Sequence, residues 1–176
     1  NATGSVTSFE YQNELISKMI LKKDSQELAE AVYGYNYERQ LTSVTLKNGS
    51  KYTFAYDFRG NISEVKLNGE VVFAYTYDEN TGNLVKQKYG QNGDAYEFEY
   101  DANHLVSKVY YCESNGDKFL RYEYVYNNLK QLVKVLDAQG VVINSYEYNQ
   151  DGKIVRATEA DVAISYSYDN LDGINS

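Results

Sequence analysis

The stretch Phe73-Ala74-Tyr75-Thr76-Tyr77-Asp78-Glu79-Asn80-Thr81-Gly82-Asn83-Leu84 contains the pattern that decides the fold. Its three aromatic residues, Phe73, Tyr75 and Tyr77, are spaced by two, which places three rings on one face of a β-strand. A polar run with Asx and glycine turn chemistry follows, and Leu84 then opens a second strand. The stretch therefore predicts an aromatic strand, a polar loop and the start of a return strand.

The same pattern recurs along the chain, which indicates a repeat protein. Eight aromatic triplets, three of them partial, account for all but five of the 26 aromatic residues (20 Tyr and 6 Phe). The period drifts around about 22 residues. The final tyrosines of the triplets are Tyr11, Tyr37, Tyr56, Tyr77, Tyr100, Tyr126, Tyr148 and Tyr168.

Each second strand opens with an aliphatic residue and most repeats close with Asn-Gly, the strongest short-range hairpin signal. Ile62 and Val65 have opposite parity, so a bulge is expected after the opening residue. The longer segment Ser25–Ala31 could hold one helical turn. The opening residues are Leu15, Leu41, Ile62, Leu84, Leu105, Leu132 and Ile154, and the Asn-Gly pairs are Asn48-Gly49, Asn68-Gly69, Asn92-Gly93 and Asn115-Gly116.

These units predict an all-β fold, a single antiparallel meander of about seven hairpin repeats with fourteen to sixteen strands. Because open sheets of more than ~10 strands curl, we expect it to be strongly curved, spiral or rolled into a barrel-like sheet. The aromatic face should be concave and buried, so Tyr77, between Tyr56 and Tyr100 in the array, should be largely buried. Residues 1–176 are predicted to be one repeat domain, part of a larger exported protein.

Composition argues against several functions. The chain has 17 basic and 25 acidic residues and a net charge of −8, without a Lys/Arg cluster, so nucleic acid and anionic membranes are poor partners. No apolar run approaches the ~20 residues of a transmembrane helix. Cys112 is the only cysteine and cannot form an internal disulfide.

No set of polar residues suggests catalysis. The loop Asp78–Asn83 offers oxygen atoms for calcium, but no later carboxylate completes such a site, so turn capping is favoured. His104 lacks a second histidine and is interpreted as a solvated turn residue. Glu97 and Glu99 are interpreted as an exposed polar face rather than a glycosidase pair. We therefore expect no catalytic, cofactor-binding or metal-binding residue and no cofactor.

Three tyrosines are the candidate ligand-binding residues. Tyr89, Tyr110 and Tyr111 lie on second strands, outside the triplets, and are expected to be exposed. Stacked tyrosines suit sugar rings or another polypeptide chain. The alternative, that the aromatic ladder is a cross-strand core, is favoured for the triplets themselves.

The repeated phrase resembles the YD repeat of the RHS family, in Tyr56-Asp57…Gly60-Asn61-Ile62, Tyr77-Asp78…Leu84 and Tyr100-Asp101…Leu105. The pattern departs from the family at Glu38, Asn127 and Asn149, where Asp is usual. The resemblance implies long spiralling sheets that enclose a toxin in large members and serve adhesion or the cell wall in others. About seven repeats look too few for such a shell. The family's Pro-rich, self-cleaving core has no counterpart in a chain without proline.

We therefore predict a non-enzymatic structural or adhesive repeat module of a bacterial cell-surface or secreted protein, extracellular in location. The alternative is a carbohydrate-binding module that uses exposed tyrosines. The expected partners are glycans, another protein or flanking repeats.

Overall fold

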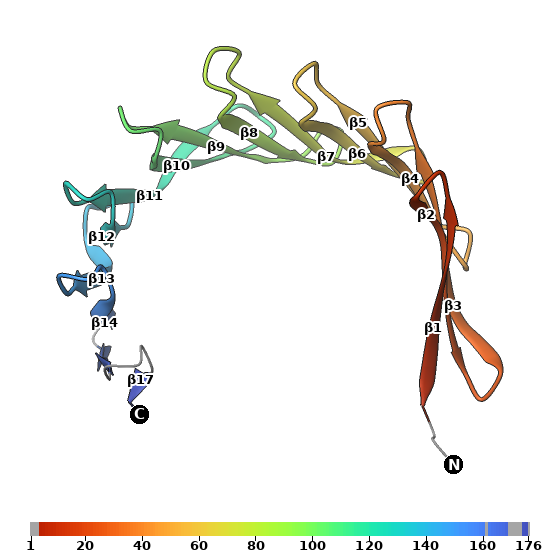
Figure 1. The fold of residues 1–176 in the computed structure, drawn as a ribbon. Helices are drawn as coiled ribbons and strands as arrows, with labels where there is room; N and C mark the ends of the chain where they lie inside the picture. Colours follow the sequence, from red (N-terminus) through yellow and green to blue (C-terminus); the bar gives the residue numbers. More distant parts are fainter. Residues whose placement is uncertain (1–3, 161, 169–173, 176) are drawn as a thin grey trace. The chain divides into compact units, whose positions relative to one another are not determined.

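The structure is a computed structural model that describes residues 4–160, 162–168 and 174–175. Fifteen strands form one sheet in which each strand lies next to its neighbours in the sequence (Figure 1). A separate two-stranded sheet follows. No helix among the described residues is long and apolar enough to cross a membrane. The predicted antiparallel meander, including its strand number, is confirmed.

The strands are short and alternate with turns. They are β1 (Ser5–Gln12), β2 (Leu15–Lys23), β3 (Gln26–Tyr35), β4 (Leu41–Leu46), β5 (Lys51–Tyr56), β6 (Ile62–Leu67), β7 (Glu70–Tyr77), β8 (Leu84–Tyr89), β9 (Ala95–Tyr100), β10 (Val106–Cys112), β11 (Lys118–Tyr126), β12 (Leu132–Leu136), β13 (Val142–Tyr148), β14 (Ile154–Glu159), β15 (Val162–Ser165), β16 (Ser167–Tyr168) and β17 (Ile174–Asn175).

The fifteen-stranded sheet is open. Its order runs from β1 to β15, and among the described residues these two end strands each pair on one side only. The rolled, barrel-like alternative is therefore wrong for this chain. The chain divides into two compact units, Asn1–Thr76 with Gln87–Gly93 (unit 1) and Tyr77–Lys86 with Asp94–Ser176 (unit 2). That residues 1–176 form a single domain stays a prediction.

The helical turn expected within Ser25–Ala31 is wrong, because this segment belongs to strand β3. Asp24 and Ser25 have φ angles of 50° and 66°, and Lys23 pairs with Gln26 across them. Two successive residues with positive φ make the two-residue hairpin turn whose twist matches that of the strands. Strand pairing thus overrides the helix-favouring composition of this segment.

Burial differs from the expectation. The most buried hydrophobic residues among those described are Ala31, Ala95, Val109, Cys112 and Val135, which keep 4–8% of their area exposed. Tyr77 and most triplet aromatics are only half-buried, so the prediction that Tyr77 is largely buried is wrong. The reason is that the described sheet is a single layer, and a face without a second layer keeps much of its area in water.

In six hairpins a β-bulge lies at the start of the second strand, as predicted. Ala55 faces Glu64 while Tyr56 faces Ile62, so one extra residue, Ser63, lies between them. The same one-residue shift follows Ile16, Leu41, Val106, Leu132 and Ile154. Leu15 opens β2 as predicted, although the bulge there follows Ile16, whereas Leu105 is wrong by one position because β10 begins at Val106.

The second aromatic triplet, predicted to end at Tyr37, is shifted by two residues from the prediction. Strand β3 ends at Tyr35, whereas Tyr37 lies in the following turn with its side chain fully exposed (108%). Asn36, rather than Glu38, consequently occupies the place of the repeated Asp. Two overlapping Tyr-x-Tyr pairs made the register ambiguous in the sequence.

Candidate functional site: the tyrosine latches and the aromatic face

In six repeats the tyrosine that ends the aromatic strand donates its hydroxyl to a backbone carbonyl of an earlier strand. The Tyr56 hydroxyl lies 2.6 Å from the Leu41 carbonyl oxygen. We call this contact the tyrosine latch. It is formed between Tyr35 and Ile16, Tyr56 and Leu41, Tyr100 and Leu84, Tyr126 and Val106, Tyr148 and Leu132, and Tyr168 and Ile154, with oxygen–oxygen distances of 2.6 to 2.9 Å.

The latch replaces backbone hydrogen bonds at the end of a strand pair. The ladder between β4 and β5 reaches only to Ser43 and Thr53, so the Leu41 carbonyl lies beyond the last backbone pair. A half-buried carbonyl without a partner costs about 1–3 kcal/mol, and the Tyr56 hydroxyl satisfies it. Because β4 is the second strand of one repeat and β5 the first of the next, each latch joins two repeats.

The Asp that follows the latch tyrosine organises the next turn. One carboxylate oxygen of Asp57 accepts hydrogen bonds from the backbone N–H groups of Arg59 and Asn61, each at 2.9 Å. Gly60 has a φ of 85°, the left-handed conformation that closes a type I turn with a bulge. The same pair of bonds is made by Asp101, Asn127, Asp137 and Asn149.

These hydrogen bonds favour the ionised carboxylates. Partial desolvation acts to raise the pKa of Asp57, but the hydrogen bonds from Asn61, Arg59 and Gly60 together lower it. The backbone N–H of Leu105 is the main cause of the lowered pKa of Asp101. The two aspartates therefore act as charged turn caps.

Asp78, the proposed alternative calcium ligand, is also a turn cap. Its Oδ1 atom accepts hydrogen bonds from the Asn80 and Thr81 N–H groups, at 3.1 and 2.8 Å, and from the Thr81 hydroxyl at 2.8 Å. Within residues 4–160, 162–168 and 174–175, no group of His, Cys, Asp and Glu is arranged to hold a metal ion. The absence of calcium binding stays a prediction.

Neighbouring turns touch each other in unit 2. The Gln131 side-chain amide donates to the Gly152 carbonyl at 3.4 Å. The Asn83 amide nitrogen lies 3.4 Å from Nδ1 of His104. His104 is exposed and has a φ of 62°, which is the position of Gly60 in its own turn. It is thus a turn residue, as the sequence indicates.

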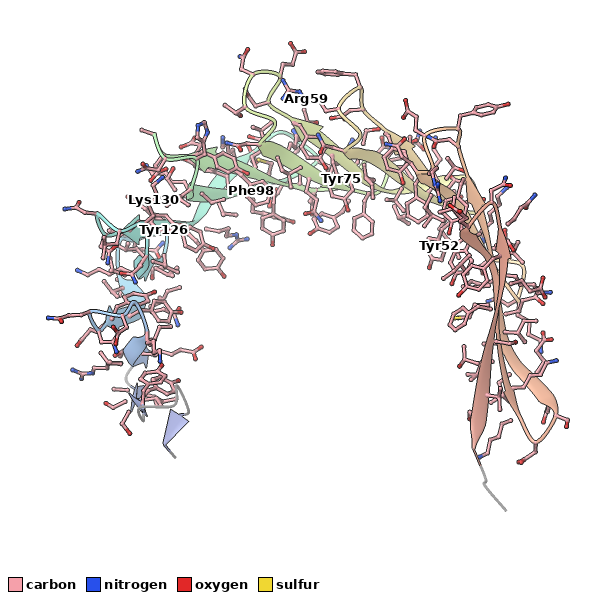
Figure 2. The ribbon with its side chains drawn as sticks, in the orientation of Figure 1. Tyr52, Arg59, Tyr75, Phe98, Tyr126 and Lys130 are labelled. Carbon is pink, nitrogen blue, oxygen red and sulfur yellow. The ribbon has the colours of Figure 1, made fainter. Side chains whose placement is uncertain are left out.

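The triplet aromatics and several rings from second strands share one face, which we call the aromatic face. In unit 1, Figure 2 shows Tyr52 and Tyr75 among the rings of this face, and Arg59 on a turn away from it. Phe73 meets Tyr89 edge-to-face at a centroid distance of 5.6 Å. In unit 2, Tyr96 and Tyr111 lie 5.7 Å apart. Such pairs add stability beyond the area they bury.

The three candidate ligand-binding tyrosines differ in their surroundings. Tyr89 belongs to unit 1 and is 40% exposed, but Tyr110 and Tyr111, which were also expected to be exposed, are half-buried. Consecutive strand residues point to opposite faces, so Tyr110 faces away from Tyr111 and pairs with Glu97. Their role in ligand binding stays a prediction.

Both half-buried tyrosines have polar partners. The Tyr111 hydroxyl donates to Asp94, and the Arg121 guanidinium lies 4.9 Å from the centre of its ring. The Tyr110 hydroxyl lies 3.3 Å from Glu99, and the Lys118 ammonium lies 4.0 Å from the centre of the Tyr110 ring. No sequence pattern points to Asp94, because its partners Tyr111 and Ser114 lie 17 and 20 residues away.

Glu97 is held as an ionised group. Its carboxylate lies 2.9 Å from the Lys86 ammonium and 3.0 Å from that of Lys118, and these two bonds lower its pKa. A glycosidase acid needs a raised pKa, so the geometry disfavours that role for Glu97. Burial raises the pKa of the neighbouring Cys112 thiol, which makes it a poor nucleophile.

The repeat is found in known proteins. A family model described as Teneurin YD-shell matches residues 2–117 and, in a second match, residues 90–176. The chain belongs to the Teneurin YD-shell family. The predicted resemblance to YD repeats is thereby confirmed.

Curated relatives of this YD-shell chain are much longer than it is. It is 30% identical over 152 residues to the tRNA3(Ser)-specific nuclease WapA of Bacillus spizizenii and 29% identical over 157 residues to the tRNA nuclease WapA of Bacillus subtilis. Each alignment covers 81% of this chain and 6% of the relative.

Solved structures share the fold. The crystal structure of TcdB2-TccC3-TEV matches 93% of this chain, and 11% of its own, with a TM-score of 0.71 and 14% identity. A structure of the Photorhabdus luminescens Tc holotoxin pore matches 98% of this chain, and 11% of its own, with a TM-score of 0.72 and 14% identity. At this level of identity the likeness concerns the fold alone.

Proposed function

We propose that this YD-shell chain is a non-catalytic structural segment of a longer bacterial exported protein of the toxin type, located outside the cell. The observation that carries the proposal is the repeated tyrosine latch, in which the final tyrosine of six repeats joins two strands. The relatives support the context, because two are named tRNA nucleases and the solved structures belong to toxin complexes.

The end strands fit a segment that continues into further repeats. All eight residues of β1 are exposed and only one of them, Glu10, is charged. A free edge of this kind presents unpaired N–H and C=O groups, and proteins normally protect such edges with charge or proline. We infer that flanking repeats, rather than glycans, are the first partners of β1 and of β15, which is likewise exposed.

The polar groups with altered pKa values have structural tasks. The aspartates cap turns, Glu97 is neutralised by two lysines, and the latch hydroxyls bind carbonyls. No convergent acid, base and nucleophile remain within the described residues to satisfy even a minimal catalytic site. We therefore assign the nuclease activity in the relatives' names to other parts of those longer chains.

A cleavage assay tests the non-catalytic role. The purified chain is incubated with bulk tRNA, with a known ribonuclease as positive control and a heat-denatured sample as blank. The expected result is no cleavage above the blank. Cleavage that co-purifies with the chain and is lost in a Glu97→Gln variant would overturn the proposal.

A second experiment tests the structural role. The chain extended at both ends by the repeats that flank it in its natural protein should melt at a higher temperature than the chain alone, because β1 and β15 then gain partners. An unchanged melting temperature would show that these edges are not joints between repeats.

A hollow in unit 1 favours carbohydrate binding as the second candidate. It has a volume of about 630 Å³ and is lined by Tyr33, Tyr37, Arg39 and polar groups of the turns at Asn13 and Asn36. An exposed ring beside amide and guanidinium donors is suited to a sugar. A glycan array with the wild type and a Tyr37→Ala variant tests it, and binding lost in the variant would establish this role.

A further inference from the structure

The four Asn-Gly pairs of the chain differ in how firmly the structure holds them. The asparagine is exposed in all four pairs, namely Asn48, Asn68, Asn92 and Asn115. Such a pair can react with itself. The nitrogen of the glycine peptide attacks the asparagine Cγ atom, a carbon–nitrogen bond forms, and ammonia leaves from a five-membered succinimide. Water then opens the ring to aspartate or isoaspartate, so neither oxidant nor enzyme is needed.

Two pairs are restrained at both reacting groups. The Asn48 side-chain oxygen accepts a hydrogen bond from Ser50 N at 3.0 Å, and Gly49 N donates to the Leu46 carbonyl at 2.9 Å. Attack requires the carboxamide to rotate and the amide nitrogen to be released. Both groups are therefore held away from the reactive geometry at Asn48.

Asn115 is held in the same way, and Asn68 at one group. The Asn115 oxygen accepts from Asp117 N at 2.9 Å, its amide donates to the Asp117 carboxylate at 2.9 Å, and Gly116 N donates to Glu113 O at 3.0 Å. The Asn68 oxygen accepts from Lys51 N at 2.8 Å, across to the neighbouring strand.

Asn92 is the exception. Among the described residues, neither its carboxamide nor the Gly93 N–H has a hydrogen-bond partner. The loop is fixed just before this pair, by Gly90 N on the Val72 carbonyl at 2.9 Å and by the Lys88 ammonium on the Gln91 carbonyl at 2.6 Å. The loop is therefore held in place, and it is the Asn92 side chain that lacks a hydrogen bond within the described part of the chain.

The glycine of this pair is required by the fold. A Cβ atom at residue 93 would lie 1.6 Å from the Tyr89 carbonyl oxygen, which no side chain can tolerate without moving the backbone. Gly93 leaves the preceding Asn92 reactive, and no larger residue can replace it because the backbone of Tyr89 lies too close.

We propose that Asn92 is a site of spontaneous covalent modification, which deamidates through a succinimide faster than the other three Asn-Gly asparagines. One net hydrogen bond changes a population by roughly fivefold. We therefore expect Asn92 to react about fivefold faster than Asn68, and Asn48 and Asn115 to react more slowly still.

The product changes the connection between β8 and β9. Isoaspartate adds one methylene group to the backbone and one negative charge. The modified residue lies two positions before Asp94, whose carboxylate accepts hydrogen bonds from the Tyr111 hydroxyl and from Ser114 N. During storage of the protein, isoaspartate is thus expected to form first in this loop.

Peptide mapping by mass spectrometry tests the proposal. The folded chain is incubated at mildly alkaline pH, which deprotonates the attacking nitrogen, and isoaspartate is followed at all four asparagines. Asn92→Gln should remove most of the early product, while the matched control Asn68→Gln should not. Equal early conversion at Asn48 or Asn115 in the folded chain would overturn the proposal.

A sample in urea separates structure from sequence. Once the chain is unfolded, the four asparagines should convert at similar rates, because the hydrogen bonds that slow three of them are gone. If Asn92 kept its lead in urea, its reactivity would come from neighbouring sequence, and the structural argument would fail.

Discussion

Replacing Tyr148 by phenylalanine removes one latch and leaves the ring in place. The hydroxyl lies 2.7 Å from the Leu132 carbonyl oxygen, a good hydrogen bond at a half-buried position. Its loss should lower the free energy of unfolding by about 1 kcal/mol. For a chain of this length, that corresponds to a fall of roughly 2–4 °C in melting temperature. Urea denaturation followed by circular dichroism measures the free energy of unfolding, and a thermal melt followed in the same way measures the melting temperature.

Tyr146 provides the matched control in the same strand. It is also half-buried, but its hydroxyl has no hydrogen-bond partner among the described residues. Tyr146→Phe should therefore change the stability by less than ~0.5 kcal/mol. Equal losses in the two variants, or a larger loss in the control, would show that the latch does not stabilise the sheet.

The latch also predicts sensitivity to alkali, since burial raises the pKa of Tyr148 above its usual value. A raised folded-state pKa contributes stability that is present below the unfolded value of about 10 and lost as the pH rises through the folded value. Wild type should consequently lose stability in this alkaline window, and Tyr148→Phe should lose less of it.

Three further changes test the turns and the metal question. Replacing Asp57 and Asp101 by asparagine keeps the oxygens that cap the turns. Because the folded-state pKa values of the two aspartates are lowered, the wild type should lose stability as the pH falls below about 4. The double variant should lose less stability than the wild type in thermal melts from pH 7 to 3. His104→Gly should raise the free energy of unfolding by up to ~1 kcal/mol, whereas Gly152→Ala, at a φ of 80°, should lower it by about 1 kcal/mol. Urea melts in which His104→Gly destabilises the chain or Gly152→Ala stabilises it would contradict the turn geometry. Calcium or a chelator should leave the melting temperature unchanged if Asp78 only caps its turn, whereas an increase with calcium would reveal a bound ion.

The repeat and its bulges could be predicted because they depend on neighbouring residues. Spacings of two define a strand face, and the change of parity between Ile62 and Val65 indicates the extra residue. The second triplet was misaligned because Tyr33, Tyr35 and Tyr37 fit two registers, and only pairing with the neighbouring strand selects one. Local patterns determine elements but not always their register.

The latch and the degree of burial could not be predicted in the same way. The partner of the Tyr56 hydroxyl is a backbone carbonyl, and backbone groups carry no sequence signal. The sequence shows that Tyr77 shares a face with other rings, but it does not show what covers that face. Both depend on how separate strands meet in space.

Every latch connects residues that are close in the sequence, with separations of 14 to 20 positions. Contacts of such short range favour rapid folding, and in repeat proteins structure can start in one unit and spread to the next. A chain that emerges gradually, from a ribosome or from a membrane channel, can therefore complete one repeat after another. Each new hairpin needs only the preceding hairpin to pair with, so the first repeats of a long array can fold before the last ones have emerged.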